Sequence, residues 1–88
     1  MLQNQWKQIE AKLNDLLEVA GERFTSAEQQ EVNEFVNLRE YGLALETFCS
    51  IAAEARNPID NDIKRRVILL HELMGCESQI VHSWIEQA

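Results

Sequence analysis

The sequence predicts an all-α protein, a compact bundle of four to five short helices that spans residues 1–88 as a single domain. Three observations support this fold class. Apolar residues recur at helical spacing along the chain, and no segment shows the sustained alternation that is typical of a strand. Glycine and proline are rare, with three and one residues, so the helices are expected to join through short connections. A chain of 88 residues forms one domain with a modest core.

The first two helices are predicted over about residues 3–20 and 25–40. Gly21 is expected to end the first helix, because glycine readily adopts the left-handed conformation that follows a helix. Thr25 and Glu28 fit a capping box, in which each side chain accepts a hydrogen bond from the other residue's backbone N–H. The apolar stripes of the two helices consist of Trp6, Ile9, Leu13, Leu16, Leu17 and Ala20, and of Val32, Phe35 and Val36.

The clearest amphipathic pattern in the chain lies at residues 38–54, and it predicts a third helix from about Tyr41. Gly42 is expected to mark a tight junction between this helix and the second. The predicted buried stripe of the third helix consists of Tyr41, Ala44, Leu45, Phe48, Ile51, Ala52 and Ala55.

The segment Asn57-Pro58-Ile59-Asp60 interrupts the helical pattern, because proline lacks an N–H donor and disfavours helix at the preceding residue. Asp60 is suited to be the N-cap of a fourth helix that ends at Gly75. Ser78 is the expected cap of a short last helix. The apolar residues of these two helices are Ile63, Val67, Leu70 and Met74, and Ile80, Val81, Trp84 and Ile85.

The chain is acidic: eight Lys and Arg residues oppose fifteen Asp and Glu residues, which gives a net charge of −7 and a pI near 4.7. A nucleic acid or an anionic membrane surface is not an expected partner, because phosphate binding requires a basic surface. The only basic cluster, Lys64-Arg65-Arg66, is expected to pair locally with Asp60 and Asp62. A basic protein is the natural partner, since opposite charges speed encounter. The alternative is that the charge only keeps the domain soluble.

The location predicted from the sequence is cytoplasmic. No stretch approaches the ~18 apolar residues that span a membrane. The N-terminus lacks the basic and apolar regions of a signal peptide. Cys49 and Cys76 lie far apart in apolar surroundings and are expected to be buried, reduced thiols, with one disulfide as the alternative.

Motifs for metal binding and nucleophilic catalysis are incomplete. The zinc metalloprotease motif that begins at His71 needs a second histidine four residues later, where Gly75 stands. A calcium loop that begins at Asp60 needs glycine and glutamate at its sixth and twelfth positions, where Arg65 and His71 stand. No serine or cysteine is flanked by a recognisable base. The sequence therefore predicts no cofactor, no metal and no enzymatic activity.

Acidic residues concentrate in the first two helices, where six carboxylates between Asn14 and Leu38 are opposed only by Arg23. Like charges at helical spacing repel and lower stability, and a basic partner would offset that cost. The alternative is a solvated face with no partner. The predicted partner-binding residues on these helices are Asp15, Glu18, Glu22, Glu31 and Glu34.

The outer face of the third helix is a second candidate surface. An apolar residue that is ringed by acids and hydroxyls is typical of a binding hot spot with a polar rim. The face consists of Leu43, Glu46, Thr47, Ser50 and Glu54, of which Leu43, Glu46 and Glu54 are the predicted partner contacts. The alternative is that the third and fourth helices are central and buried on more than one face, because Ile68 and Leu69 also fall outside the stripe of the fourth helix.

Residues 38–75 resemble a family of small bacterial immunity proteins, which includes the MafI-type immunity proteins and some immunity proteins of contact-dependent growth inhibition. Members are short, largely helical and often acidic, and they carry a Glu-Tyr-Gly-x-Ala-x-Glu helix followed by a Pro-Ile helix start. The resemblance is carried by residues 39–49 (REYGLALETFC), Glu54, Asn57-Pro58-Ile59 and Leu73-Met74-Gly75. It implies that Tyr41, Gly42, Ala44, Leu45 and Phe48 serve the fold, and it carries over no specific contact residue.

The resemblance implies a cytoplasmic antitoxin that binds the toxic C-terminal domain of a polymorphic secreted toxin, frequently a nuclease with a basic active site. The acidic composition and the lack of a catalytic motif agree with this function. Two other classes stay open. One is a helical adaptor or regulatory subunit that dimerises or docks on an unrelated protein, and the other is a small enzyme or metal protein whose site is assembled in space.

Overall fold

The computed structural model describes residues 3–54, 61–75 and 78–87. These residues form five α-helices and one 3-10 turn, and the predicted all-α bundle is confirmed. The elements in chain order are α1 (Gln3–Ala20), the 3-10 turn η1 (Gly21–Arg23), α2 (Ser26–Asn37), α3 (Tyr41–Glu54), α4 (Asn61–Met74) and α5 (Gln79–Gln87).

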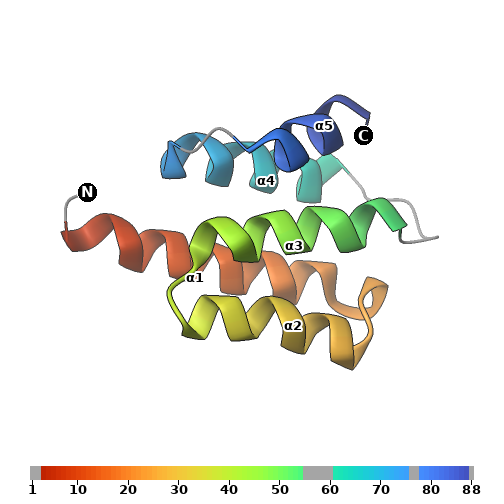
Figure 1. The fold of residues 1–88 in the computed structure, drawn as a ribbon, viewed down its shortest axis with the longest axis horizontal. Helices are drawn as coiled ribbons and strands as arrows, with labels where there is room; N and C mark the ends of the chain where they lie inside the picture. The colour runs from red at the N-terminus through yellow and green to blue at the C-terminus, as the bar shows by residue number, and fades with distance from the viewer. Residues whose placement is uncertain (1–2, 55–60, 76–77, 88) are drawn as a thin grey trace.

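The helices form two layers, and consecutive helices run in opposite directions (Figure 1). One layer contains α2, α3 and α5, with α3 between the other two, and the second layer contains α1 and α4. α3 contacts all four other α-helices, most extensively α2 and then α5. α3 is therefore the central helix, and it still keeps one face toward solvent.

The connection between α1 and α2 follows the predicted local signals. Gly21 has a φ of +46°, which ends α1 as expected. The capping box is present: the Glu28 N–H donates to Thr25 Oγ1 at 3.1 Å, and the Thr25 N–H donates to Glu28 Oε1 at 2.8 Å. The amide of Gln29 donates to the carbonyl of Gly21 at 2.8 Å, which holds the connection against the start of α2.

The junction between α2 and α3 differs from the prediction, because Arg39 and not Gly42 makes the sharp turn. Arg39 has a φ of +59°, whereas Gly42 lies in the first turn of α3 without positive φ. The Arg39 N–H donates to the carbonyl of Val36 at 3.0 Å, and the Glu40 N–H donates to that of Phe35 at 2.8 Å. This is the hydrogen-bond pattern of a Schellman motif with arginine at the left-handed position.

Two side-chain contacts hold this junction against α1. The guanidinium of Arg39 stacks over the indole of Trp6 at 4.5 Å, and the Tyr41 hydroxyl donates to Glu10 Oε2 at 2.9 Å. Burial and this hydrogen bond raise the pKa of Tyr41. The stacked guanidinium gains cation–π attraction, which favours the strained turn.

The ends of α4 and α5 agree with the prediction where the structure describes them. Gly75 has a φ of +63° and follows α4, and the Val81 N–H donates to Ser78 Oγ at 3.3 Å as an N-terminal cap of α5. His71 is half-buried in the last turn of α4. The predicted roles of Ala55, Asn57-Pro58-Ile59-Asp60 and Cys76 lie outside the described residues.

The core lies between the two layers and contains most of the predicted stripes. Trp6, Leu17, Phe35 and Ile51 are only half-buried, because they lie at the edges of their helices' buried faces. Phe24 was not predicted, yet it is buried, and its ring lies 4.7 Å from that of Phe48. Its position in the connection between η1 and α2 has no helical period that could reveal it.

Candidate functional site

All five predicted acidic residues of the first two helices lie at the surface. Asp15 and Glu18 are exposed on α1, Glu22 is exposed in η1, and Glu31 and Glu34 are exposed on α2. Within the described parts of the chain, none of the five forms an ion pair. Their charges are therefore available to an external partner.

The five acidic side chains do not all line the same groove. Glu18 lines a shallow groove of about 450 Å³ between α1 and α2. The other lining residues are mostly amides and hydroxyls: Asn14, Leu17, Ser26, Gln29, Gln30 and Asn33. Glu31 and Glu34 are not among them and project from another part of the surface of α2.

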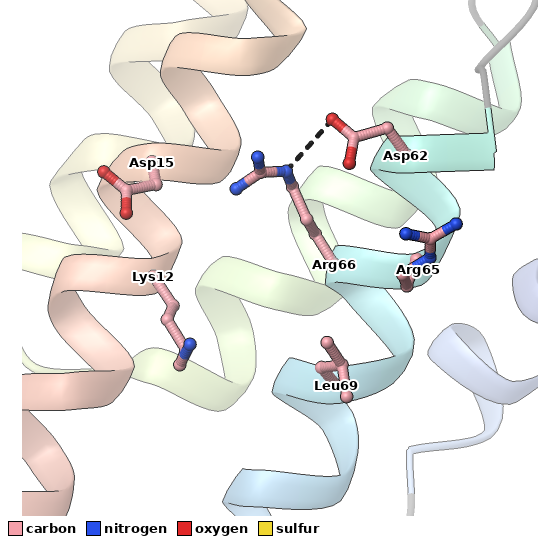
Figure 2. Close-up of a pocket in the computed structure, with 6 residues that line it drawn as sticks. All are labelled: Lys12, Asp15, Asp62, Arg65, Arg66 and Leu69. Carbon is pink, nitrogen blue, oxygen red and sulfur yellow. Dashed lines mark hydrogen bonds and ion pairs between the residues drawn. The ribbon is translucent and has the colours of Figure 1, made fainter.

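Asp15 lines a different groove, of about 220 Å³, between α1 and α4. Figure 2 shows the Arg66 guanidinium between Asp62 and Asp15, with Lys12 and Leu69 further along the groove. Arg66 Nε lies 3.2 Å from Asp62 Oδ2, so one of the predicted local ion pairs of the basic cluster is confirmed. Lys12, Arg65 and Arg66 line the same groove as Asp15, and the five acids do not share one groove.

The outer face of α3 is exposed as predicted, although α3 is also central. Leu43 is 46% exposed, Ser50 and Glu54 are exposed, and Glu46 and Thr47 are half-buried. The sequence also left open that the third helix is central and buried on more than one face. This is correct for the part of α3 away from its outer face, where Cys49 is completely buried.

A groove between α3 and α5 was missed by sequence reasoning. It has a volume of about 340 Å³ and adjoins the outer face of α3. Ile80 contributes an exposed apolar side chain to it, at 47% exposure. The sequence grouped Ile80 with the apolar residues Val81, Trp84 and Ile85 of the last helix, and its helical spacing from Trp84 gave no signal of this exposure. The lining residues are Cys49, Ser50, Ala53, Gln79, Ile80, Ser83 and Trp84.

Cys49 at the base of this groove is a free thiol that is unsuited to nucleophilic chemistry. Burial, and secondarily the negative charge of Glu46, raise the pKa of Cys49 to about 12. A thiol with this pKa stays protonated at neutral pH, and the thiolate is the reactive form. Glu46 lies three and four residues before Cys49 and Ser50 on α3, one helical turn from this groove.

Across residues 3–54, 61–75 and 78–87, no group of three or more His, Cys, Asp or Glu side chains is arranged to hold a metal ion. In that same part of the chain, no helix combines the length and the apolar character needed to cross a membrane.

Comparison with known proteins gives no match to a family model, to a curated protein or to a solved structure.

Proposed function

We propose that this protein is a cytoplasmic immunity protein. It binds the toxic C-terminal domain of a cognate secreted toxin, expected to be a nuclease, and covers the basic surface on which that domain binds nucleic acid. The observation that carries the proposal is a set of exposed carboxylates that make no ion pair within the described residues, together with the exposed side chain of Leu43 on α3. The resemblance of residues 38–75 to immunity proteins gives the class of partner.

The charge distribution supports a basic protein as the partner. Carboxylates at a protein surface can occupy the positions that phosphates take on a nuclease. Opposite fields raise association rates well above those of neutral pairs, and the effect is largest at low ionic strength. A chain with a net charge of −7 is therefore suited to rapid capture of a basic domain.

The helical framework supports tight binding because the carboxylates project from packed helices. Glu18, Glu31, Glu34 and Glu46 each belong to a helix with a buried face, so their backbone positions are fixed before binding. Fixed positions lower the entropy that is lost on association. A stable complex of this kind needs an interface of roughly 1,200–2,000 Å².

The function is tested by co-expression with the C-terminal domain of a large secreted protein, if one is encoded just upstream. We expect rescue of growth together with a stable one-to-one complex on co-purification. Survival without a complex would indicate an indirect role. If neither rescue nor a complex is seen, the proposal is wrong, and the adaptor alternative is then tested by measuring the oligomeric state of the isolated protein.

A further inference from the structure

We propose that the groove between α3 and α5 receives an apolar side chain from a basic segment of the toxin domain and is the main apolar contact of the complex. The assignment rests on the function proposed above and adds to it the chemistry of the bound segment. The groove lies beside the outer face of α3, so one partner segment can contact both.

The groove has the composition of a binding hot spot. Ser50, Ala53 and Ser83 are small and exposed along its length, which leaves room for a side chain from outside. Trp84 and Cys49 close its base and are almost completely buried. Ile80 stands in the groove at 47% exposure and offers apolar area that binding would remove from water. Buried apolar contacts with a polar rim dominate the energy of many protein interfaces.

The charges around the groove indicate a basic and not an acidic segment. Glu46 lies one helical turn before Ser50, which lines the groove, and Glu54 lies one turn after it on the same side of α3. Neither glutamate forms an ion pair within the described parts of the chain. Lys or Arg residues beside the inserted side chain would be attracted to them, whereas acidic residues would be repelled.

The groove between α1 and α4 supplies a contrast within the same molecule. Leu69 is exposed to a similar extent, at 52%, but its groove contains three cations, Lys12, Arg65 and Arg66, against the two carboxylates of Asp15 and Asp62 (Figure 2). A basic segment would meet an excess of positive charge there. Leu69 is therefore a matched control for Ile80: both are large aliphatic residues on exposed helix faces, in grooves of different charge.

The experiment compares Ile80→Ser with Leu69→Ser by the binding kinetics of each purified variant with the purified toxin C-terminal domain. We expect Ile80→Ser to raise Kd about tenfold or more, mainly through faster dissociation, as is usual when an interface hot spot is truncated. Leu69→Ser is expected to leave Kd within about twofold of wild type. Circular dichroism and thermal melting establish that both variants are folded.

A second variant tests the groove without removing Ile80. Ser83 is exposed, so Ser83→Trp fills the groove from outside and leaves the core intact. We expect it to raise Kd at least as much as Ile80→Ser does. The assignment is overturned if wild type binds the toxin domain while Ile80→Ser and Ser83→Trp bind equally well, or if Leu69→Ser weakens binding as much as they do. If wild type binds no toxin domain, the proposed function fails, and this assignment fails with it.

Discussion

At the scale of single residues, Arg39 shows how side-chain contacts hold a strained backbone. Its φ of +59° lies in the left-handed region, which costs a residue other than glycine roughly 1–2 kcal/mol. The cation–π contact with Trp6 offsets part of that cost. Gly42, three residues later, was the expected junction residue, yet it needs no positive φ.

Substitution of Arg39 can separate the backbone cost from the side-chain contact. Arg39→Gly and Arg39→Ala both lose the contact with Trp6, but only alanine keeps the left-handed strain. We expect the free energy of unfolding of Arg39→Gly to exceed that of Arg39→Ala by about 1 kcal/mol. Urea unfolding followed by circular dichroism measures the difference. Equal stabilities would contradict the positive φ at this position.

The raised pKa of Cys49 predicts that the folded protein loses stability at alkaline pH. Its pKa is raised from its ordinary value of 9.0 to about 12, so the folded protein holds the thiol proton more tightly than the unfolded chain does. The stabilising effect is fully present below pH 9 and is lost as the pH rises toward 12. At pH 10 the loss amounts to about 1 kcal/mol relative to pH 8.

The measurement is the free energy of unfolding of wild type and Cys49→Ala at pH 8, 9 and 10. We expect the variant to be less stable at pH 8, because alanine leaves a small cavity. Its stability should then fall less steeply with pH, and other alkaline titrations cancel in the comparison. Parallel pH dependences would show that Cys49 does not titrate as described.

At the scale of secondary-structure elements, the ends of the helices are fixed largely by local sequence. The capping box at Thr25 and the left-handed glycines at 21 and 75 could all be predicted, because each depends on contacts between near neighbours. The turn at Arg39 could not, since its stacking partner Trp6 is distant in the sequence.

The capping box gives a prediction at this scale. Thr25→Ala removes the hydroxyl that accepts from the Glu28 N–H, and we expect it to lower the free energy of unfolding by about 1 kcal/mol. Ser26→Ala is the control, because Ser26 is the exposed next residue and belongs to α2 itself. It should change stability by no more than about 0.5 kcal/mol. Urea unfolding of the two variants checks the prediction, and equal losses would mean that the cap contributes nothing specific.

At the scale of the whole molecule, the prediction concerns electrostatic attraction of the partner. Glu31→Lys combined with Glu34→Lys should lower the association rate with the toxin domain about tenfold at low salt. The salt dependence of that rate should become weaker. Stopped-flow or surface-based kinetics at several salt concentrations measure both effects.

Single reversals supply the control for net charge. Glu31→Lys and Glu72→Lys change the net charge equally, but Glu72 is exposed on α4, in the other layer of the bundle. We expect Glu31→Lys to slow association more. If the two single variants behave alike, only the net charge matters and α2 is not part of the contact. If the double variant associates as fast as wild type at low salt, the α2 acids have no role in capture.

Part of the candidate site could be predicted because exposure follows from helical period. Leu43, Ser50 and Glu54 fall opposite the buried stripe of α3 and are exposed as expected. Lys12 is near Asp15 on α1 itself, but Arg66 of α4 could not be predicted there, because it lines the same groove only when α1 and α4 pack side by side. The groove that includes Ile80 depends in the same way on the packing of α5 against α3.

The sequence by itself determined the helices, most of their ends, the buried stripes and the net charge, because these depend on residue type and on spacing within one helix. Only the tertiary structure decided which exposed faces lie together. It placed Asp15 in one groove with Arg66 of α4, and it joined the outer face of α3 to Ile80 of α5. The physical reason is that many arrangements of helices bury the same stripes, and the choice among them depends on side-chain packing between helices that are distant in the sequence.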